Sequence, residues 1–173
     1  MIAVLVTGMS AVGKSAALAE LAARGHETVD TDDPGWIEVV DGEPLWREDR
    51  VRDLLDRPRT GPLFVQGTVA NQGVFAAHFA AVVLLTAPIE VILQRLRDRG
   101  SNDFGKTEEE RAAVLRDHRD VEPLLRASAT HVIDTRAPLA SVVARLLEIA
   151  ATAAPRPSPA QSSGLIIEVE ATS

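Results

Sequence analysis

The chain has 173 residues, a formal net charge of −7 and a pI near 5.1, and 46% of its residues are hydrophobic. This length suits one compact domain. The acidic balance argues against a nucleic-acid surface, the absence of cysteine excludes disulfides and thiolate sites, and no apolar run approaches the roughly 18 residues that span a membrane. Because no secretion signal is evident either, we expect a cytoplasmic protein that binds neither nucleic acid nor membranes.

The first 25 residues predict a strand, a loop and a helix. Residues 2–7 are apolar, as in a strand that is buried on both faces. An alanine-rich helix is expected from Lys14 to Arg24, with Gly25 as its C-cap. The loop between them matches the pattern Gly-x-x-x-x-Gly-Lys-Ser, with the sequence Gly8-Met9-Ser10-Ala11-Val12-Gly13-Lys14-Ser15. In this context the pattern predicts a phosphate-binding P-loop.

Each fixed position of this loop has a physical reason. Glycines let the backbone curl so that its N–H groups point at phosphate oxygens, and the following helix directs its positive end at the same anion. Lys14 supplies a full charge to the terminal phosphates, and the Ser15 hydroxyl is placed to bind Mg²⁺. We therefore expect a nucleotide to be bound by Gly8, Ser10, Ala11, Val12, Gly13, Lys14, Ser15 and Ala16.

An acidic segment follows the first helix. A second strand over 26–29 opens into the turn-rich sequence Asp30-Thr31-Asp32-Asp33-Pro34-Gly35, and a helix is expected over 45–56. Residues 27–56 carry eleven carboxylates against three arginines. Most of these acids suit a solvated face, and the first few also suit a side of a cleft that binds a metal or a polyhydroxyl compound.

The remaining elements alternate between strands and helices. Strands are expected over 63–66, 81–86 and 130–133, with a short helix or turn over 71–79 and a helix over 89–98. The Thr107 and Glu110 pair has capping-box spacing and predicts a helix from 107 to about 127. Pro138 starts a last helix through Ile149, and the Pro/Ser-rich residues 151–173 are expected to form a tail.

This alternation predicts an α/β fold. We expect a three-layer P-loop NTPase fold over residues 1–150, with a five-stranded parallel sheet in the order 2-3-1-4-5 flanked by helices. Residues 30–60 are the expected acceptor region. Residues 99–107 lack periodicity and are the expected mobile lid.

Several nucleotide-binding classes do not fit the sequence. A regulatory GTPase needs an Asn-Lys-x-Asp segment, which the sequence lacks. Large mechanical ATPases need a strand that ends in an acid and further sensor elements, whereas the third strand here ends in Gln66-Gly67 and the chain is short. A small-molecule kinase fits the length best.

The P-loop followed by Val29-Asp30-Thr31-Asp32 resembles the shikimate kinase and gluconate kinase branch of the nucleoside monophosphate kinase-like proteins. The resemblance covers about residues 1–150 and implies ATP and Mg²⁺. It implies that Asp30 helps to hold Mg²⁺ through water and that Asp32 contacts the acceptor hydroxyl as the base. The other reading of these acids is a turn or helix cap built by Asp-Asp-Pro-Gly.

The resemblance also assigns basic residues. Arg95 stands where such kinases place an arginine over the adenine, and Arg99, with Lys106, belongs to a cationic lid that closes on the transferring phosphate. The segment 133–138 resembles the one that lines the adenine, so Arg136 and Pro138 are candidate adenine contacts. A solvated helix end explains the arginines equally well, and Pro138 equally suits a first-turn proline.

Departures from the family leave the acceptor open. In place of the family's glycine run the chain has Gln66-Gly67-Thr68, and Val121 stands where a carboxylate-gripping arginine is expected. Arg47 could match the family's other carboxylate-binding arginine. Turn formation and helix capping explain Thr68, Asn71 and Gln72 as well as acceptor binding does. The expected substrate contacts are Asp32, Arg47, Gly67 and Thr68.

Two functions follow from the sequence. The first is an ATP-dependent phosphotransferase that uses Lys14, Asp32 and Arg99 on a small hydroxyl- or phosphate-bearing metabolite, as a monomer or homodimer. The alternative is an ATP-binding switch protein with slow or no hydrolysis.

Overall fold

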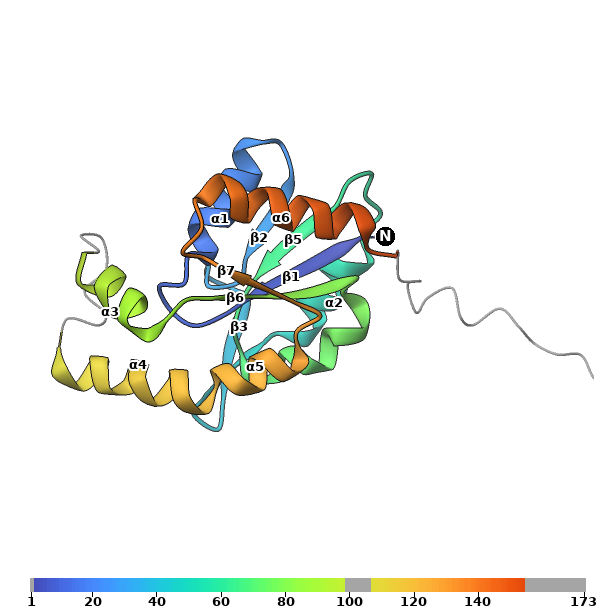
Figure 1. The fold of residues 1–173 in the computed structure, drawn as a ribbon. Helices are drawn as coiled ribbons and strands as arrows, with labels where there is room; N and C mark the ends of the chain where they lie inside the picture. Colours follow the sequence, from blue (N-terminus) through green and yellow to red (C-terminus); the bar gives the residue numbers. More distant parts are fainter. Residues whose placement is uncertain (1, 99–106, 155–173) are drawn as a thin grey trace, which may run out of the picture.

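A sheet of five parallel strands forms the centre of the computed structural model, which describes residues 2–98 and 107–154 (Figure 1). From one edge to the other, the strands are β2 (Glu27–Asp30), β5 (Leu63–Gln66), β1 (Ala3–Thr7), β6 (Ala81–Thr86) and β7 (His131–Asp134). Counted along the chain, these are strands 2-3-1-4-5. The predicted fold class and strand order are confirmed.

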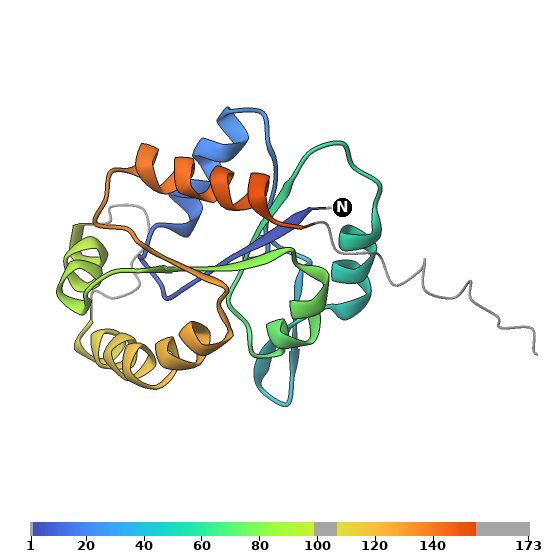
Figure 2. The same ribbon diagram turned by 45° about the vertical axis from the view of Figure 1, so that its right-hand side comes forward.

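Alternate residues of the central strands enter two separate cores. Val4 and Val6 pack on one face of the sheet, whereas Ala3 and Leu5 pack on the other. This is why the first strand is an uninterrupted apolar run. The first face is covered by α1 (Lys14–Ala23) and α6 (Leu139–Thr152), which lie together in both views (Figures 1 and 2). The opposite core contains side chains of α2 (Glu48–Asp56) and of the region of the 3-10 helix η1 (Ala70–His78).

The second half of the chain contributes α3 (Ile89–Asp98), α4 (Glu108–Asp120) and α5 (Glu122–Ser128). The capping box is confirmed, because Thr107 Oγ1 accepts from the Glu110 N–H and the Glu110 carboxylate accepts from the Thr107 N–H. The single helix expected up to residue 127 is wrong, since it breaks at Val121. Pro123 has no N–H to donate to the carbonyl four residues earlier, so an unbroken helix loses that bond.

A hairpin of β3 (Ile37–Val40) and β4 (Glu43–Trp46) was not expected from the sequence. Its turn residues Asp41 and Gly42 both have positive φ, 53° and 85°, as two-residue hairpin turns require. The helix predicted over 45–56 therefore starts only at Glu48. Trp46 is held in the strand because it is fully buried and its N–H donates to Asn71 Oδ1 at 2.9 Å.

Two predictions concern residues outside the described ranges. The expected lid, with Arg99 and Lys106, falls on residues 99–106, and most of the expected tail falls on residues 155–173. Where the tail was expected to begin, α6 continues to Thr152. Among the described helices, none combines the length and the apolar character that a membrane crossing requires.

Candidate active site

The loop between β1 and α1 has the backbone of an anion-binding loop. Gly8, Ala11 and Gly13 have positive φ values of 146°, 61° and 104°. A Cβ atom on Gly8 would lie 2.3 Å from the Leu85 carbonyl oxygen, so the loop's entry into the sheet edge requires glycine. Left-handed residues placed among right-handed ones direct backbone N–H groups toward a common point, and α1 begins directly after Gly13. The predicted phosphate-binding residues are thus brought together in one loop.

Lys14 lies over the start of this loop. Its Nζ donates to the Gly8 carbonyl at 2.7 Å and to the Met9 carbonyl at 3.1 Å. Thr68, from the segment after β5, contacts the same residue, because its hydroxyl donates to the Gly8 carbonyl at 2.9 Å. The lysine charge is therefore held at the loop, next to the threonine expected to contact the acceptor.

Ser15, Asp30 and Asp32 meet around Gln66, at the ends of β2 and β5. The Gln66 Nε2 amide donates to Asp30 Oδ1 at 2.8 Å and to Asp32 Oδ2 at 3.1 Å, and lies 3.5 Å from Ser15 Oγ. Register explains the meeting, since Asp30 and Gln66 are paired across neighbouring strands. Parallel strands end at the same edge, where open sheets bind ligands.

This donor set fits Mg²⁺. Two carboxylates and a hydroxyl supply the oxygen ligands that Mg²⁺ prefers, and Mg²⁺ usually takes only one or two carboxylates beside water and substrate phosphates. Within residues 2–98 and 107–154, no group of three or more acidic or histidine side chains is arranged to hold a metal by itself. Ser15 and Asp30 are the residues that would hold the ion beside a bound nucleotide.

The pKa of Asp30 is raised above its ordinary value, chiefly because burial disfavours the charged carboxylate. The negative charges of Asp32 and Asp33 raise this pKa further, whereas hydrogen bonds from the Asp32 N–H and from Gln66 oppose the rise. Asp30 is thus held next to two other acids at an energetic cost, and a cation bound there would relieve it.

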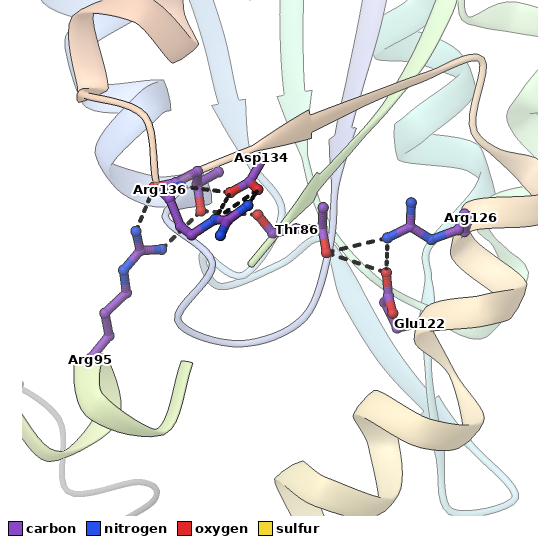
Figure 3. A network of polar contacts seen from close by, with 7 residues as sticks. Thr86, Arg95, Glu122, Arg126, Asp134 and Arg136 are labelled. Carbon is purple, nitrogen blue, oxygen red and sulfur yellow. Dashed lines mark hydrogen bonds and ion pairs between the residues drawn. The ribbon is translucent and has the colours of Figure 1, made fainter. Parts of the chain in front are cut away.

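A cavity of about 440 Å³ lies beside the P-loop and contains Arg95. Its walls come from the start of α1, from α3 and from the connection between β7 and α6, and they consist of Ala11, Val12, Gly13, Ala16, Arg95, Asp98, Thr135, Ala137, Leu139 and Val142. The Arg95 guanidinium donates to the Val12 carbonyl at 3.2 Å and to Thr135 Oγ1 at 2.9 Å. Figure 3 shows Arg95 pointing from its helix toward the segment that follows β7. The size and the mostly apolar lining of this cavity suit a small-molecule ligand.

Arg136 and Pro138 do not line this cavity, although Ala137 between them does. The Arg136 guanidinium instead forms an exposed ion pair with Asp134, with 2.6 Å between Nη2 and Oδ2 (Figure 3). Hydrogen bonds from the Arg136 side chain and backbone hold the pKa of Asp134 below its ordinary value.

Two predicted substrate contacts have partners within the fold. The Arg47 Nε lies 3.8 Å from Glu38 Oε2 across the hairpin, and both side chains are about half exposed. Gly67 is closely packed, because a Cβ atom there would lie 2.2 Å from Thr31 Oγ1 and 2.7 Å from the Trp46 ring. The structure places Arg47 in an ion pair with Glu38 and explains Gly67 by packing.

The sequence interpretation missed a polar network at the end of β6. Thr86 Oγ1 donates to Glu122 Oε1 at 3.3 Å, and Arg126 Nη2 donates to the same oxygen at 2.5 Å (Figure 3). The four-residue spacing of Glu122 and Arg126 was a signal for their ion pair. Nothing local pointed to Thr86, or to Thr135 as the partner of Arg95.

A family model described as an AAA domain matches residues 4–116, which run from β1 into α4. These residues make up more than half of the chain. They include the P-loop, Asp30, Asp32, Gln66 and Arg95. The chain belongs to this AAA domain family.

Solved kinase structures share the fold of this AAA domain. A shikimate kinase from Acinetobacter baumannii in complex with shikimate is 20% identical, with a TM-score of 0.60 over 86% of this chain and 92% of that one. A shikimate kinase from Bacteroides thetaiotaomicron is 15% identical, with a TM-score of 0.59 over 86% and 97%. A sugar kinase from Janibacter sp. is 22% identical, with a TM-score of 0.55 over 90% and 96%. At these identities the likeness establishes the fold. No curated protein matches the sequence closely enough to count as a relative.

Proposed function

We propose that this protein is an ATP-dependent phosphotransferase that moves the γ-phosphoryl group of ATP to a small hydroxyl- or phosphate-bearing metabolite. The observation that carries the proposal is a group of four side chains at one edge of the sheet. Lys14 bonds to the P-loop backbone, and Gln66 contacts Ser15, Asp30 and Asp32. A site that only binds a nucleotide and Mg²⁺ has no need for a second carboxylate such as Asp32 beside Asp30. The kinases with the same fold support the same reaction class.

On the donor side, we assign the triphosphate to the P-loop and the adenine to the cavity next to Arg95. The loop N–H groups and Lys14 stabilise charge on the phosphates, which is the main catalytic need in phosphoryl transfer. Mg²⁺, held by Ser15 and Asp30, supplies further neutralisation of that charge when bound. ATP is preferred over GTP in this proposal because of the fold's resemblance to shikimate and sugar kinases.

On the acceptor side, we assign Asp32 to orient the attacking hydroxyl and to accept its proton. Thr68 is the acceptor contact closest to the P-loop, because its hydroxyl already bonds to Gly8. Arg47 and Gly67 remain proposed parts of the acceptor region, and Arg99 remains the proposed cation of the lid. These assignments require the acceptor to lie between Asp32 and Thr68, next to Lys14.

The proposal is tested with Lys14→Ala. ADP formation is measured with a pool of metabolites, followed by single compounds, and the variant is expected to lose at least about a thousandfold in kcat, because a full charge at the transferring phosphate is removed. Arg119→Ala is the matched control, since Arg119 is an exposed cation paired with Asp120. Undiminished phosphoryl transfer by a clean Lys14→Ala preparation contradicts the proposal. Nucleotide binding with no acceptor in the whole pool favours the switch protein instead.

A further inference from the structure

A second cavity, of about 410 Å³, lies between the β3–β4 hairpin, η1 and α5. Its volume is within the range of small-molecule sites, roughly 300–1,000 Å³. The described residues that line it are Glu43, Pro44, Thr68, Val69, Ala70, Gln72, Gly73, Val121, Leu124, Leu125 and Ser128. Of these lining residues, only Thr68 has a role assigned above, as a proposed acceptor contact.

The polar wall of the cavity is joined to the P-loop. Thr68 Oγ1 bonds to Gly8 and lies 3.1 Å from Thr7 Oγ1. Gln72, also in the wall, accepts a hydrogen bond from Thr7 Oγ1 at 3.2 Å. Because Thr7 and Gly8 lead into the P-loop, a ligand that touches this wall lies next to the start of that loop.

The opposite wall of the cavity is apolar. It is built by Val121, Leu124 and Leu125 where α4 gives way to α5, with Val69 beside them. Leu124 is 68% exposed although it lines the cavity, so a large aliphatic side chain faces water at the opening. A mostly apolar lining with a few polar groups beside it is typical of a small-molecule site.

The charges around the cavity oppose an anion. Among the lining residues that the structure describes, none is basic and only Glu43 is ionisable. The nearest arginine on α5, Arg126, is already paired with Glu122. An anionic group in this cavity would therefore lose water without gaining a cation from the described lining, and it would face the Glu43 carboxylate.

We propose, resting on the proposed phosphotransferase function, that the acceptor is an alcohol with an apolar body and with no carboxylate or phosphate on the side that enters this cavity. Its body lies against Leu124 and Val121, and its hydroxyl lies near Thr68. In the reaction the hydroxyl oxygen forms a bond to the γ-phosphorus while the bond from that phosphorus to the β–γ bridging oxygen breaks. The hydroxyl proton passes to Asp32, and ADP leaves.

The experiment uses cyclic alcohols in pairs that differ only in charge. Each pair consists of a carboxylate and its methyl ester, such as shikimate and methyl shikimate. Binding to the full chain is measured by calorimetry with Mg²⁺ and a non-hydrolysable ATP analogue, and transfer is measured separately as ADP formation with ATP. The esters are expected to bind at least tenfold more tightly than the acids.

Leu124→Arg tests the position of the site. An arginine there adds a cation to the apolar wall, so the ester should bind about tenfold more weakly and the acid more tightly. Leu115→Arg is the matched control, because Leu115 is also an exposed leucine, on α4, and does not line the cavity. This control should bind both compounds as the wild type does.

The outcomes separate the two proposals. Preference for the acids, no binding by any ester, or equal behaviour of the two arginine variants overturns the assignment of this cavity. If acids are phosphorylated, the phosphotransferase function still stands. If esters bind as predicted but neither they nor any metabolite of the pool is phosphorylated, the cavity's preference for an uncharged ligand stands and the phosphotransferase function is lost.

Discussion

At the scale of single residues, Gln66 organises the acidic side of the site. Its side chain is buried, and one amide nitrogen donates to both Asp30 and Asp32. The reversed amide would place its oxygen against two carboxylates, so the charges decide its orientation. An acid at this position would add a third negative charge. The amide instead donates a hydrogen bond to each of the two carboxylates.

The raised pKa of Asp30 predicts that Asp30→Asn stabilises the protein without ligand. Because the native pKa lies above the unfolded one, ionised Asp30 opposes folding at neutral pH, and this penalty is relieved as pH falls through the native pKa. The variant should therefore unfold at higher urea than the wild type at pH 7–8. The difference should shrink as the pH approaches the ordinary range of aspartate.

Asp134→Asn is the matched control, and we expect it to change the stability in the opposite direction. The pKa of Asp134 is lowered by Arg136, so its ionised form favours folding above the unfolded pKa, and this contribution is lost as pH falls through the native pKa. Its removal should lower the urea midpoint slightly at neutral pH, since the pair is exposed. Urea titrations of both variants at several pH values check the two signs. A lower midpoint for Asp30→Asn at neutral pH contradicts the prediction.

At the scale of secondary-structure elements, the end of β5 is joined to the β3–β4 hairpin through Thr31. The Thr31 hydroxyl donates to the Gln66 carbonyl at 2.8 Å and accepts from the Trp46 indole N–H at 2.8 Å. Gly67 passes directly beneath this contact. The segment that leads from β5 to Thr68 and the P-loop therefore has no room for a side chain at position 67.

Gly67→Ala should consequently destabilise the protein by about 1–3 kcal/mol, as overpacking of a tight site does. Its Cβ would lie within 3 Å of both Thr31 and Trp46, so the hairpin must shift. Gly61→Ala is the control, because a Cβ there meets no atom within 4 Å. The free energy of unfolding in urea checks both. Equal stability of the two variants would show that the Trp46 contact tolerates a methyl group.

At the scale of the whole molecule, Arg95 connects three parts of the chain that are distant in sequence. From α3 it bonds to the carbonyls of Ala11 and Val12, 84 and 83 residues earlier, and to Thr135, 40 residues later. These segments also form the walls of the cavity assigned to the adenine. One planar guanidinium thus holds the P-loop and the segment that follows β7 at the spacing that the cavity needs.

Arg95→Lys keeps the charge and removes the planar fork, so it should weaken ATP binding by about tenfold and lower stability by roughly 1–2 kcal/mol. Titration with a fluorescent ATP analogue measures the first effect, and urea unfolding measures the second. Arg97→Lys is the control, since Arg97 lies on the same helix and its guanidinium bonds to Gln94 at the surface. Unchanged nucleotide affinity in Arg95→Lys rules out a role for the arginine in shaping the cavity.

The local sequence was sufficient to predict the P-loop and the five strands of the parallel sheet. A strand that is buried on both faces is a continuous apolar run, and the glycine pattern of the loop predicts its backbone conformation. Local signals were also present for the hairpin, in Asp41-Gly42, and for the helix break at Pro123, although the interpretation missed both.

Only the tertiary structure decided which side chains meet. The grouping of Gln66 with Asp30 and Asp32 depends on the register between β2 and β5, and the seating of Arg95 depends on three segments that the chain brings together from far apart. The apolar wall at Val121 and Leu124 becomes part of a cavity only because α5 packs opposite η1 and the hairpin. Residue type and local periodicity carry no information about such distances. The sequence by itself therefore determined a nucleotide-binding fold, and tertiary packing decided the shape and charge of the second cavity, where we propose that the acceptor binds.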